Sequence, residues 1–411
     1  MQHPIKTSLA LACTMLLACG AAQASDAEGE YHGYFRAGLG SSTDSRGPQS
    51  CFGLGGNTMR YRLGNECDTY GEFEYQKEMA KSANGVSFVG HIMVAAYTPS
   101  SAVSDSDLSM SKMYVEAKNI PTLNGGTAWI GKRYYMRPDI HMLDLQYINM
   151  NGTGGGIDQY KLGPGRISYG LFKDNDKPGN SAIRQNLVYQ GIPVNQDGTL
   201  EVLTTLITPD KKDSTSHGGW QATVLHKQDK VWGGANTFGI QYGVGPGTGA
   251  GGQCCDRMGT TGSIRNGSDV TRLRIFNSLW IQPTPEWSAE MVAIVQRDKS
   301  NVSGGSSTWT TVGVRPVYAV NDNFKLQFEL GTDRVTSPTG GAAQRLTKLT
   351  IAPTLTAGEG HWSRPELRAF VTYGKWNDAA TAAVNKANES GPVYGNATSG
   401  TSFGLQVETW F

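Results

Sequence analysis

The chain has 411 residues, and its mean hydropathy of −0.37 is too polar for a bundle of membrane-spanning helices. Glycine accounts for 53 residues, about 13% against a usual ~7%, while charged residues make up only 17%. Lys plus Arg (36) nearly equals Asp plus Glu (35), so no overall field favours nucleic acid or anionic membranes. These figures favour a large all-β protein, either a soluble sandwich or a membrane barrel.

Residues 1–24 are typical of a secretory signal peptide. Lys6 supplies the positive start, residues 8–19 form an apolar core, and residues 22–24 (Ala-Gln-Ala) give a small-x-small cleavage site. A membrane anchor fits less well because the apolar stretch is short and a polar segment follows. A lipoprotein signal ending at Cys19 fits poorly because Leu17 is bulky. One domain is therefore expected, over residues 25–411.

Removal of this leader would leave four cysteines, and an even number in an exported protein suggests disulfides. Cys51 and Cys67 bracket a Gly-rich stretch, where a bridge would contribute about 3 kcal/mol in the chain-entropy model. Cys254 and Cys255 are adjacent within a second Gly-rich stretch. The sequence leaves their redox state open.

Period-two segments recur along the chain, as in β-strands with two different faces. The best examples are residues 31–39, 69–79, 199–207, 311–319, 324–332, 365–373 and 402–411. Tight turns are expected at residues 163–165, 196–198, 282–285 and 321–323, and long polar loops at residues 244–268, 299–307 and 376–401. Short turns alternating with long loops favour an outer-membrane β-barrel. Sixteen to nineteen strands can be counted, and eighteen of ~10 residues fit the length.

The C-terminus decides between barrel and sandwich. Phe411 and the alternate residues before it form one apolar face, while Glu408 and Trp410 belong to the other. A final strand that ends on an aromatic residue, with its apolar face outward, is similar to the assembly signal of bacterial outer-membrane barrels. The outward face would contact lipid, so Glu408 and Trp410 are expected in the lumen. The alternative is an ordinary edge strand.

The same alternation assigns other side chains to the lumen. Residues 31–39, 58–64 and 68–76 are each expected to place their apolar side chains toward lipid, including Tyr61 and Leu63, and their charged ones inward. The predicted luminal set is His32, Tyr34, Arg36, Arg60, Arg62, Asp68, Tyr70, Glu72, Glu74, Glu408 and Trp410. Aromatic rings can pack on the C–H faces of pyranose rings, and mixed Arg and carboxylate side chains can satisfy sugar hydroxyls. The set predicts a channel that binds carbohydrate weakly.

At this point the sequence resembles the maltoporins, the sugar-specific porins. The resemblance is carried by YHGY at 31–34, YRLGNEC at 61–67, GKRYY at 131–135, DIHM at 139–142, TVGVRP at 311–316 and WSRP at 362–365. It runs from residue 31 to residue 411, more weakly over 175–270. It implies an eighteen-stranded antiparallel barrel in the outer membrane of a Gram-negative bacterium, a homotrimer, and facilitated diffusion of maltose and maltodextrins.

The resemblance also implies roles for individual residues. Those matching the aromatic slide are Tyr34, Tyr70, Trp362 and Trp410, and those matching the polar tracks are Arg36, Arg62, Glu72, Arg137 and Asp144. Cys51 and Cys67 match the family's disulfide in the first external loop. No metal or other cofactor is expected.

Four departures from the family pattern bear on the substrate. A constriction tyrosine is replaced by Gln146, and a slide tryptophan from the neighbouring subunit has no counterpart. A lower slide phenylalanine aligns with Ala235, close to Trp232, and a track arginine aligns near Ser111, beside Lys112. The loss of a ring at the narrowest point should widen the pore, so the natural sugar stays open.

A general diffusion porin and a barrel enzyme are the two alternatives to a sugar porin. A general diffusion porin would show linear flux and no sugar block. A barrel enzyme would need a catalytic constellation, but the seven histidines form neither a His-Glu-x-x-His motif nor another paired metal spacing. The Gly-x-Ser-x-Gly match at residues 400–404 runs into the last period-two segment and is not a strand-to-helix elbow. We therefore expect a channel rather than an enzyme. A phage-receptor role for the external loops is left open.

Overall fold

The structure is a computed structural model of the chain. It describes residues 22–24, 28–43, 49–55, 58–99, 107–174, 181–210, 215–252, 257–301, 304–386 and 393–411. Cys254 and Cys255 therefore lie outside the described residues, as does the core of the predicted leader.

Nearly every regular element is a β-strand. The long strands are β2 (Glu30–Ser42), β3 (Thr69–Ser82), β4 (Ser87–Thr98), β5 (Asp107–Ile120), β6 (Gly126–Arg133), β7 (Gly152–Leu162), β8 (Gly165–Asp174), β9 (Ala182–Asn195), β10 (Gly198–Pro209), β11 (Gly219–Val231), β12 (Gly234–Val244), β13 (Thr271–Ile281), β14 (Trp287–Ser300), β15 (Gly305–Asn321), β16 (Phe324–Val335), β17 (Gln344–Thr356), β18 (Glu366–Trp376) and β19 (Ser399–Trp410). All seven predicted period-two segments coincide with strands, two of them shifted by one residue at an end.

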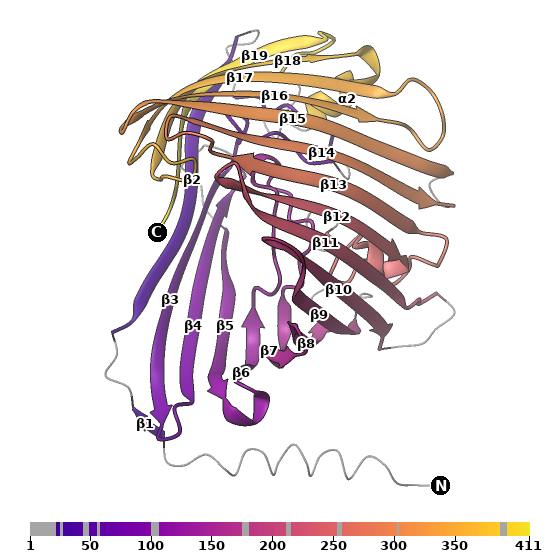
Figure 1. Cartoon of the computed structure of the whole chain (residues 1–411). Coiled ribbons are helices and arrows are strands. Elements are labelled where there is room, and N and C mark those ends of the chain that lie inside the picture. Colours follow the sequence, from indigo (N-terminus) through magenta and orange to yellow (C-terminus); the bar gives the residue numbers. More distant parts are fainter. Residues whose placement is uncertain are drawn as a thin grey trace.

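These strands close into one barrel. Each strand pairs antiparallel with its sequence neighbour, and β19 closes the barrel by pairing with β2 (Figure 1). In this last pair, Trp410 lies opposite Tyr34. The predicted eighteen-stranded antiparallel barrel is confirmed. A further short strand, β1 (Ala22–Ala24), pairs with the end of β3. It coincides with the predicted cleavage site, and the cleavage itself stays a prediction.

Connections alternate in length around the barrel. Residues 163–164, 196–197 and 322–323 are tight turns at one end, whereas residues 43–68, 134–151, 245–270 and 377–398 are long connections at the other. The expected long loop at 299–307 is wrong, since β14 and β15 extend into it. The last long connection holds the short helix α2 (Thr381–Lys386). No helix of the described ranges has the length and apolar character to cross a membrane.

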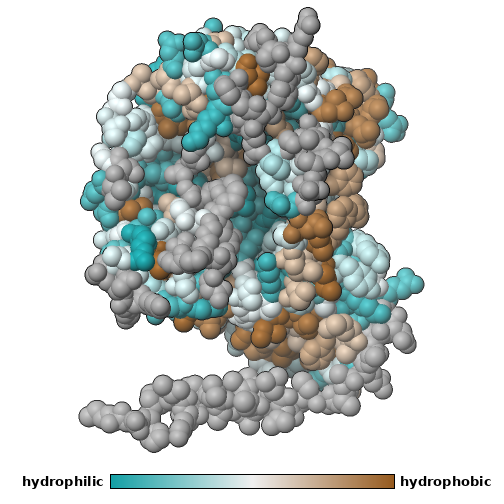
Figure 2. Space-filling model, turned by 180° about the vertical axis from the view of Figure 1, so that it is seen from behind, coloured by the Kyte–Doolittle hydropathy of each residue, from teal (hydrophilic) through white to brown (hydrophobic). Residues whose placement is uncertain are grey.

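Side chains alternate between the outside and the inside of the barrel. Phe73, Leu405 and Phe411 are exposed on the outer surface, while Glu72, Gln406 and Glu408 are buried inside. Figure 2 shows brown apolar patches on the outside and a teal hydrophilic hollow between them. This confirms the predicted alternation for β2, β3 and β19, with Tyr34, Tyr70 and Trp410 on the inner side. An apolar outer face suits contact with lipid.

The connection 134–151, here called loop 3, folds into the barrel and narrows it. Its apolar residues pack on the inner wall in a buried cluster that includes Ile140, Leu143, Tyr147 and Met150. The 3-10 turn η2 (His141–Leu143) ends at Asp144, whose φ of 51° reverses the chain at the tip of the loop. Side-chain donors of the wall bind loop backbone, for example Gln241 Nε2 to the Tyr147 carbonyl at 2.8 Å. Loop 3 is therefore held as part of the wall.

The connection 43–68, here called loop 1, also folds inward, and this corrects one prediction. Residues 58–64 form no strand, and Tyr61 and Leu63 are each 1% exposed inside the barrel, not against lipid. The Tyr61 hydroxyl lies 2.7 Å from Thr311 Oγ1, and Lys348 donates to the Leu63 carbonyl at 2.8 Å. The segment alternates because one side packs on the opposite wall and the other faces the channel.

Three features fix loop 1 in this position. Cys51 and Cys67 form a disulfide, as the family resemblance implies. Buried Asn65 accepts from the Phe52 amide at 2.6 Å and donates to the carbonyls of Phe52 and Tyr61. The Arg62 amide donates to the Met142 carbonyl at 3.0 Å, which joins loop 1 to loop 3.

Candidate functional site

A cavity of about 750 Å³ lies inside the barrel between loop 1 and loop 3. It is lined by Tyr34, Arg36, Met59, Arg60, Arg62, Asp68, Tyr70, Glu72, Tyr97, Arg137, Asp139, His141, Asp144, Gln146, Arg257 and Trp410. The predicted slide, track and constriction residues all line this cavity except Trp362, whose ring centroid lies 6.4 Å from that of Trp410. His32, Glu74 and Glu408, also predicted in the lumen, are not part of the lining. The cavity brings together segments that are far apart in the chain.

Five aromatic rings form a row that begins in this cavity and extends beyond it. The ring centroids of Tyr70 and Tyr34 are 6.1 Å apart, and Tyr34 is the strand partner of Trp410. Trp410 is followed by Trp362 and then by Trp280, whose centroid is 5.8 Å from that of Trp362. All five rings are half-buried, so each leaves part of its surface open to the lumen.

Trp280 is a member of this row that was missed in the sequence. It lies on β13 directly opposite Ala235, so it supplies a ring where the family comparison placed none. Trp232, considered for this place, is 70% exposed in the turn between β11 and β12 and does not join the row. The alternation of β13 was the available signal, because Trp280 shares the inner face with buried Arg272 and Arg274.

Ion pairs run beside the rings. Arg36 contacts Asp68 at 2.7 Å and Asp144 at 3.2 Å, and Arg137 contacts Glu72 at 3.2 Å. Burial opposes ionisation of Asp144, but the charges of Arg62 and Arg36 outweigh burial and lower the pKa of this carboxyl. The left-handed turn at Asp144 is what brings its carboxylate across the lumen to β2. Guanidinium donors and carboxylate acceptors therefore lie together beside the aromatic rings.

Glu408 is the centre of a deeply buried charge cluster. Its carboxylate is 1% exposed and receives hydrogen bonds from Arg62 at 2.8 Å, Arg368 at 2.6 Å and Tyr34 at 3.1 Å. Arg364 Nη2 lies 3.3 Å away, and the Arg364 guanidinium covers the Trp410 ring at 4.1 Å. The cluster holds two rings of the row, because Glu408 accepts from the Tyr34 hydroxyl and Arg364 covers Trp410.

The departures from the family pattern have structural counterparts. Gln146 lines the cavity but is only 4% exposed, and its Oε1 accepts from Asn149 Nδ2 at 2.6 Å. Tyr97, on β4 opposite Tyr70, adds a further ring to the cavity lining. Lys112 binds Glu74 at 2.6 Å, while Ser111 is buried. The assignment of Gln146 to the narrowest point stays a prediction.

His141 joins loop 3 to the charge cluster. Its ring lies edge-on to Trp362 at 5.2 Å and to Trp410 at 6.0 Å. Burial alone would lower its pKa, but the carboxylates of Glu408 and Glu290 outweigh burial and the charge of Arg62, and raise the pKa above 6.5. The imidazolium therefore persists to higher pH than that of a free histidine.

We expect the preference of the channel for anions over cations to decrease in one step as His141 loses its proton. Raising the pH through the elevated pKa of His141 removes one positive charge beside the ring row, so the channel should shift toward cations at a pH above the usual range of histidine. Reversal potentials in a salt gradient, measured from pH 5 to 9, check this. His141→Gln should flatten that step; a full step in the variant would assign it to another group.

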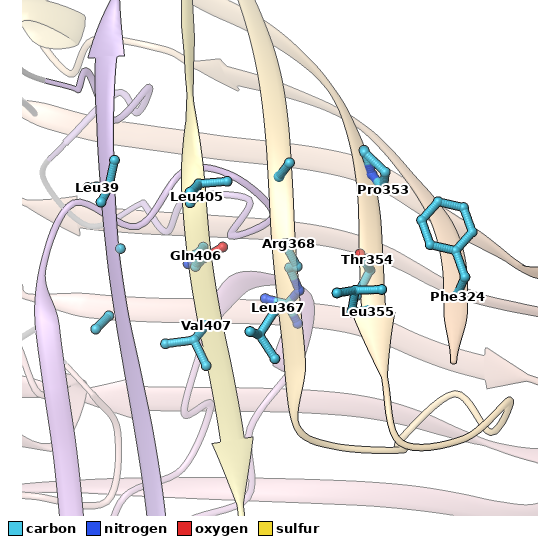
Figure 3. Close-up of a pocket in the computed structure, with 13 residues that line it drawn as sticks. Leu39, Phe324, Pro353, Thr354, Leu355, Leu367, Arg368, Leu405, Gln406 and Val407 are labelled. Atoms are coloured by element: carbon cyan, nitrogen blue, oxygen red, sulfur yellow. The ribbon is translucent and has the colours of Figure 1, made fainter. Parts of the chain in front are cut away.

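A second hollow lies on the outer surface and lacks the chemistry of a solute site. It is formed by β2 and β16–β19 and lined by Leu39, Phe324, Leu355, Leu367 and Leu405, among others (Figure 3). The apolar side chains in Figure 3 are on the face of the strands opposite the lumen. The small residues Ala37, Gly38 and Ala369 also line this hollow. It suits a lipid chain or another protein surface.

Comparison with known proteins decides the family. The profile of the LamB porins matches residues 30–411, nearly the whole described barrel. The chain belongs to the LamB porin family. It is therefore an outer-membrane porin of a Gram-negative bacterium.

Solved structures support the fold of this LamB porin. It is similar to OccD3 (OpdP) of Pseudomonas aeruginosa, with a TM-score of 0.52 and 8% identity over 95% of this chain and 93% of that one. A variant of OccD1 (OprD) gives a TM-score of 0.50 and 8% identity, covering 95% and 97% of the two chains. OmpT of Vibrio cholerae, in a trimer form, gives a TM-score of 0.45 at 12% identity, covering 93% and 99%. At these identities the likeness concerns the fold alone.

Proposed function

We propose that this LamB porin is a sugar-selective channel for facilitated diffusion of maltose, maltodextrins or related oligosaccharides. The single observation that carries the proposal is the row of five half-buried rings, Tyr70, Tyr34, Trp410, Trp362 and Trp280, beside a line of ion pairs. Pyranose faces can pack on the rings, and their hydroxyls can exchange hydrogen bonds with the charged side chains.

Two physical points support movement rather than retention. The charged groups are already paired with one another, as in Arg36 with Asp68 and Arg137 with Glu72, so a sugar hydroxyl gains only a modest hydrogen bond. The ring centroids of Tyr70 and Tyr34, of Trp410 and Trp362, and of Trp362 and Trp280 are each about 6 Å apart. A sugar can therefore contact the next ring of each pair before it leaves the last. Weak and repeated contacts are what a conduit requires.

Planar-bilayer conductance titrated with maltose, maltotriose, sucrose and a β-glucoside tests the proposal. We expect saturable block of the ion current by at least one of these sugars, with maltotriose binding more tightly than maltose because it covers more rings. The ranking also identifies the preferred sugar. If none of them reduces the current, and flux rises linearly with sugar concentration, the alternative of a general diffusion porin holds instead.

We also propose that the porin is a homotrimer and that residues 1–24 are removed on export. The apolar outer groove in Figure 3 supports close approach of a second copy of the chain, because its lining includes the small residues Ala37, Gly38 and Ala369, which let strands come near. The mass of the unheated protein in detergent tests the trimer. The N-terminal sequence of protein taken from the outer membrane tests the leader.

A further inference from the structure

The connection 245–270, here called loop 6, contributes one side chain to the lumen cavity. Arg257 comes from the part of this loop that follows the undescribed residues 253–256, and it lines the same cavity as Arg137. Its neighbour Met258 is fully buried in the cluster that holds loop 3, and the Asn149 amide donates to the Met258 carbonyl at 2.8 Å. The Gly259 carbonyl accepts from buried Arg184 at 3.1 Å. Arg257 is therefore held at a fixed place.

The guanidinium of Arg257 differs from the other luminal arginines in its partners. Arg36 and Arg62 each have two or more carboxylate contacts, whereas Arg257 has no ion pair with any described residue. Its Nε is buried without a hydrogen-bond partner, and the same is true of the Nε of Arg137. Two guanidiniums with unused donors thus face one cavity.

The two arginines are also close enough to repel each other. Burial is the largest influence that lowers the pKa of Arg257, and the charge of Arg137 adds to it, while Asp144 opposes it. Asp144 is engaged by Arg36 at 3.2 Å, and Glu72 is the carboxylate partner of Arg137. An anion bound in the cavity beside both guanidiniums would relieve this repulsion.

We propose that Arg137 and Arg257 form a binding site for a carboxylate carried by a saccharide, which makes acidic oligosaccharides the preferred substrates of this porin. The guanidinium fork matches a carboxylate in two parallel hydrogen bonds. A monoanion fits better than a dianionic phosphate because Glu72, Asp139 and Asp144 line the same cavity and repel a second charge. The inference rests on the proposed function, since the rings would hold the rest of the sugar.

Maltobionate and maltitol give a matched test in planar bilayers. Both are maltose with its terminal ring opened, and they differ only in a carboxylate against a hydroxymethyl group. In 0.1 M KCl, at low voltage of both polarities, we expect maltobionate to block the parent channel about five-fold more tightly than maltitol. The preference should shrink in 1 M KCl, because the Debye length falls from ~10 Å to ~3 Å.

Three variants locate the preference. Arg257→Met should bring the ratio near one while maltose still blocks, which shows that the channel is folded. Arg257→Lys should keep part of the preference through its charge, and Arg265→Met, exposed on the same loop, should keep all of it. A parent ratio of one or less, or an unchanged ratio in Arg257→Met, would overturn this site while leaving the sugar channel in place. Absence of maltose block in the parent would overturn the proposed function, and this site with it.

Discussion

Glu408→Gln is expected to destabilise the folded barrel by about 3 kcal/mol, the loss typical of removing one partner from a buried ion pair. The carboxylate of Glu408 is the shared acceptor for Arg62, Arg368 and Tyr34. A glutamine keeps one oxygen but turns the other acceptor into an amide donor that faces a guanidinium. The net positive charge left in a site that is 1% exposed has no other carboxylate to take over all of these contacts.

The loss can be measured as the shift in the urea or temperature midpoint at which the barrel unfolds in detergent. Glu201→Gln is the matched control, because Glu201 is paired with the part-exposed Lys227 at 2.9 Å and should cost well under 1 kcal/mol. Equal midpoints for Glu408→Gln and the parent would mean that water in the lumen, rather than Glu408, neutralises the arginines.

The strands and their faces could be predicted because a barrel wall contacts two different solvents. Phe403 and Leu405 alternate with Gln406 and Glu408 since one face meets lipid and the other meets polar lumen. Eighteen strands could not be counted from this pattern alone. Strand number depends on which segments are too weakly alternating to recognise, and the family resemblance supplied the number.

Loop 1 shows why the same pattern can mislead. Met59, Tyr61 and Leu63 alternate with arginines, as in a strand whose apolar face meets lipid. Tyr61 instead fills the space above Gly313 and Gly331, where a Cβ on either glycine would lie 2.1–2.2 Å from its ring. A chain segment that packs on one wall inside a barrel has the same period as the wall itself. In the sequence, only the distant Gly313 and Gly331, which leave space for the Tyr61 ring, distinguish this segment from a strand of the wall.

Long-range placement explains the residues that were missed. Trp280 takes the place beside Ala235 by reaching in from the next strand, so a comparison position by position along one strand overlooks it. Arg257 follows a Gly-rich stretch with no strand pattern, and its direction depends on Met258 entering a cluster formed by loop 3. The alternation of β13 indicated the inner face for Trp280 but not its neighbour on β12, and the contact of Met258 has no local sequence signature. The predicted slide and track residues, in contrast, lie beside strands or motifs that fix their direction.

Trp410→Ala is expected to weaken maltotriose binding by roughly 1 kcal/mol, about five-fold in the dissociation constant, with ion conductance unchanged or higher. Trp410 is the middle ring of the row and links Tyr34 to Trp362. Its removal interrupts the path for a sliding pyranose as well as one contact. Tyr70→Ala, at the end of the row, should lose a similar amount of affinity but leave the other four rings in their order.

Trp410→Phe and Trp287→Ala separate the ring from other consequences of the change. The phenylalanine keeps a stacking face under Arg364 and should retain most of the affinity. Trp287 is exposed on the outer surface beside Tyr318, so its truncation should leave sugar block unaltered. If Trp410→Ala and Tyr70→Ala both bind maltotriose as tightly as the parent, the rings do not carry the sugar. Binding would then depend on the paired arginines and carboxylates, and loss of affinity in Arg36→Met rather than in the ring variants would be the consistent result.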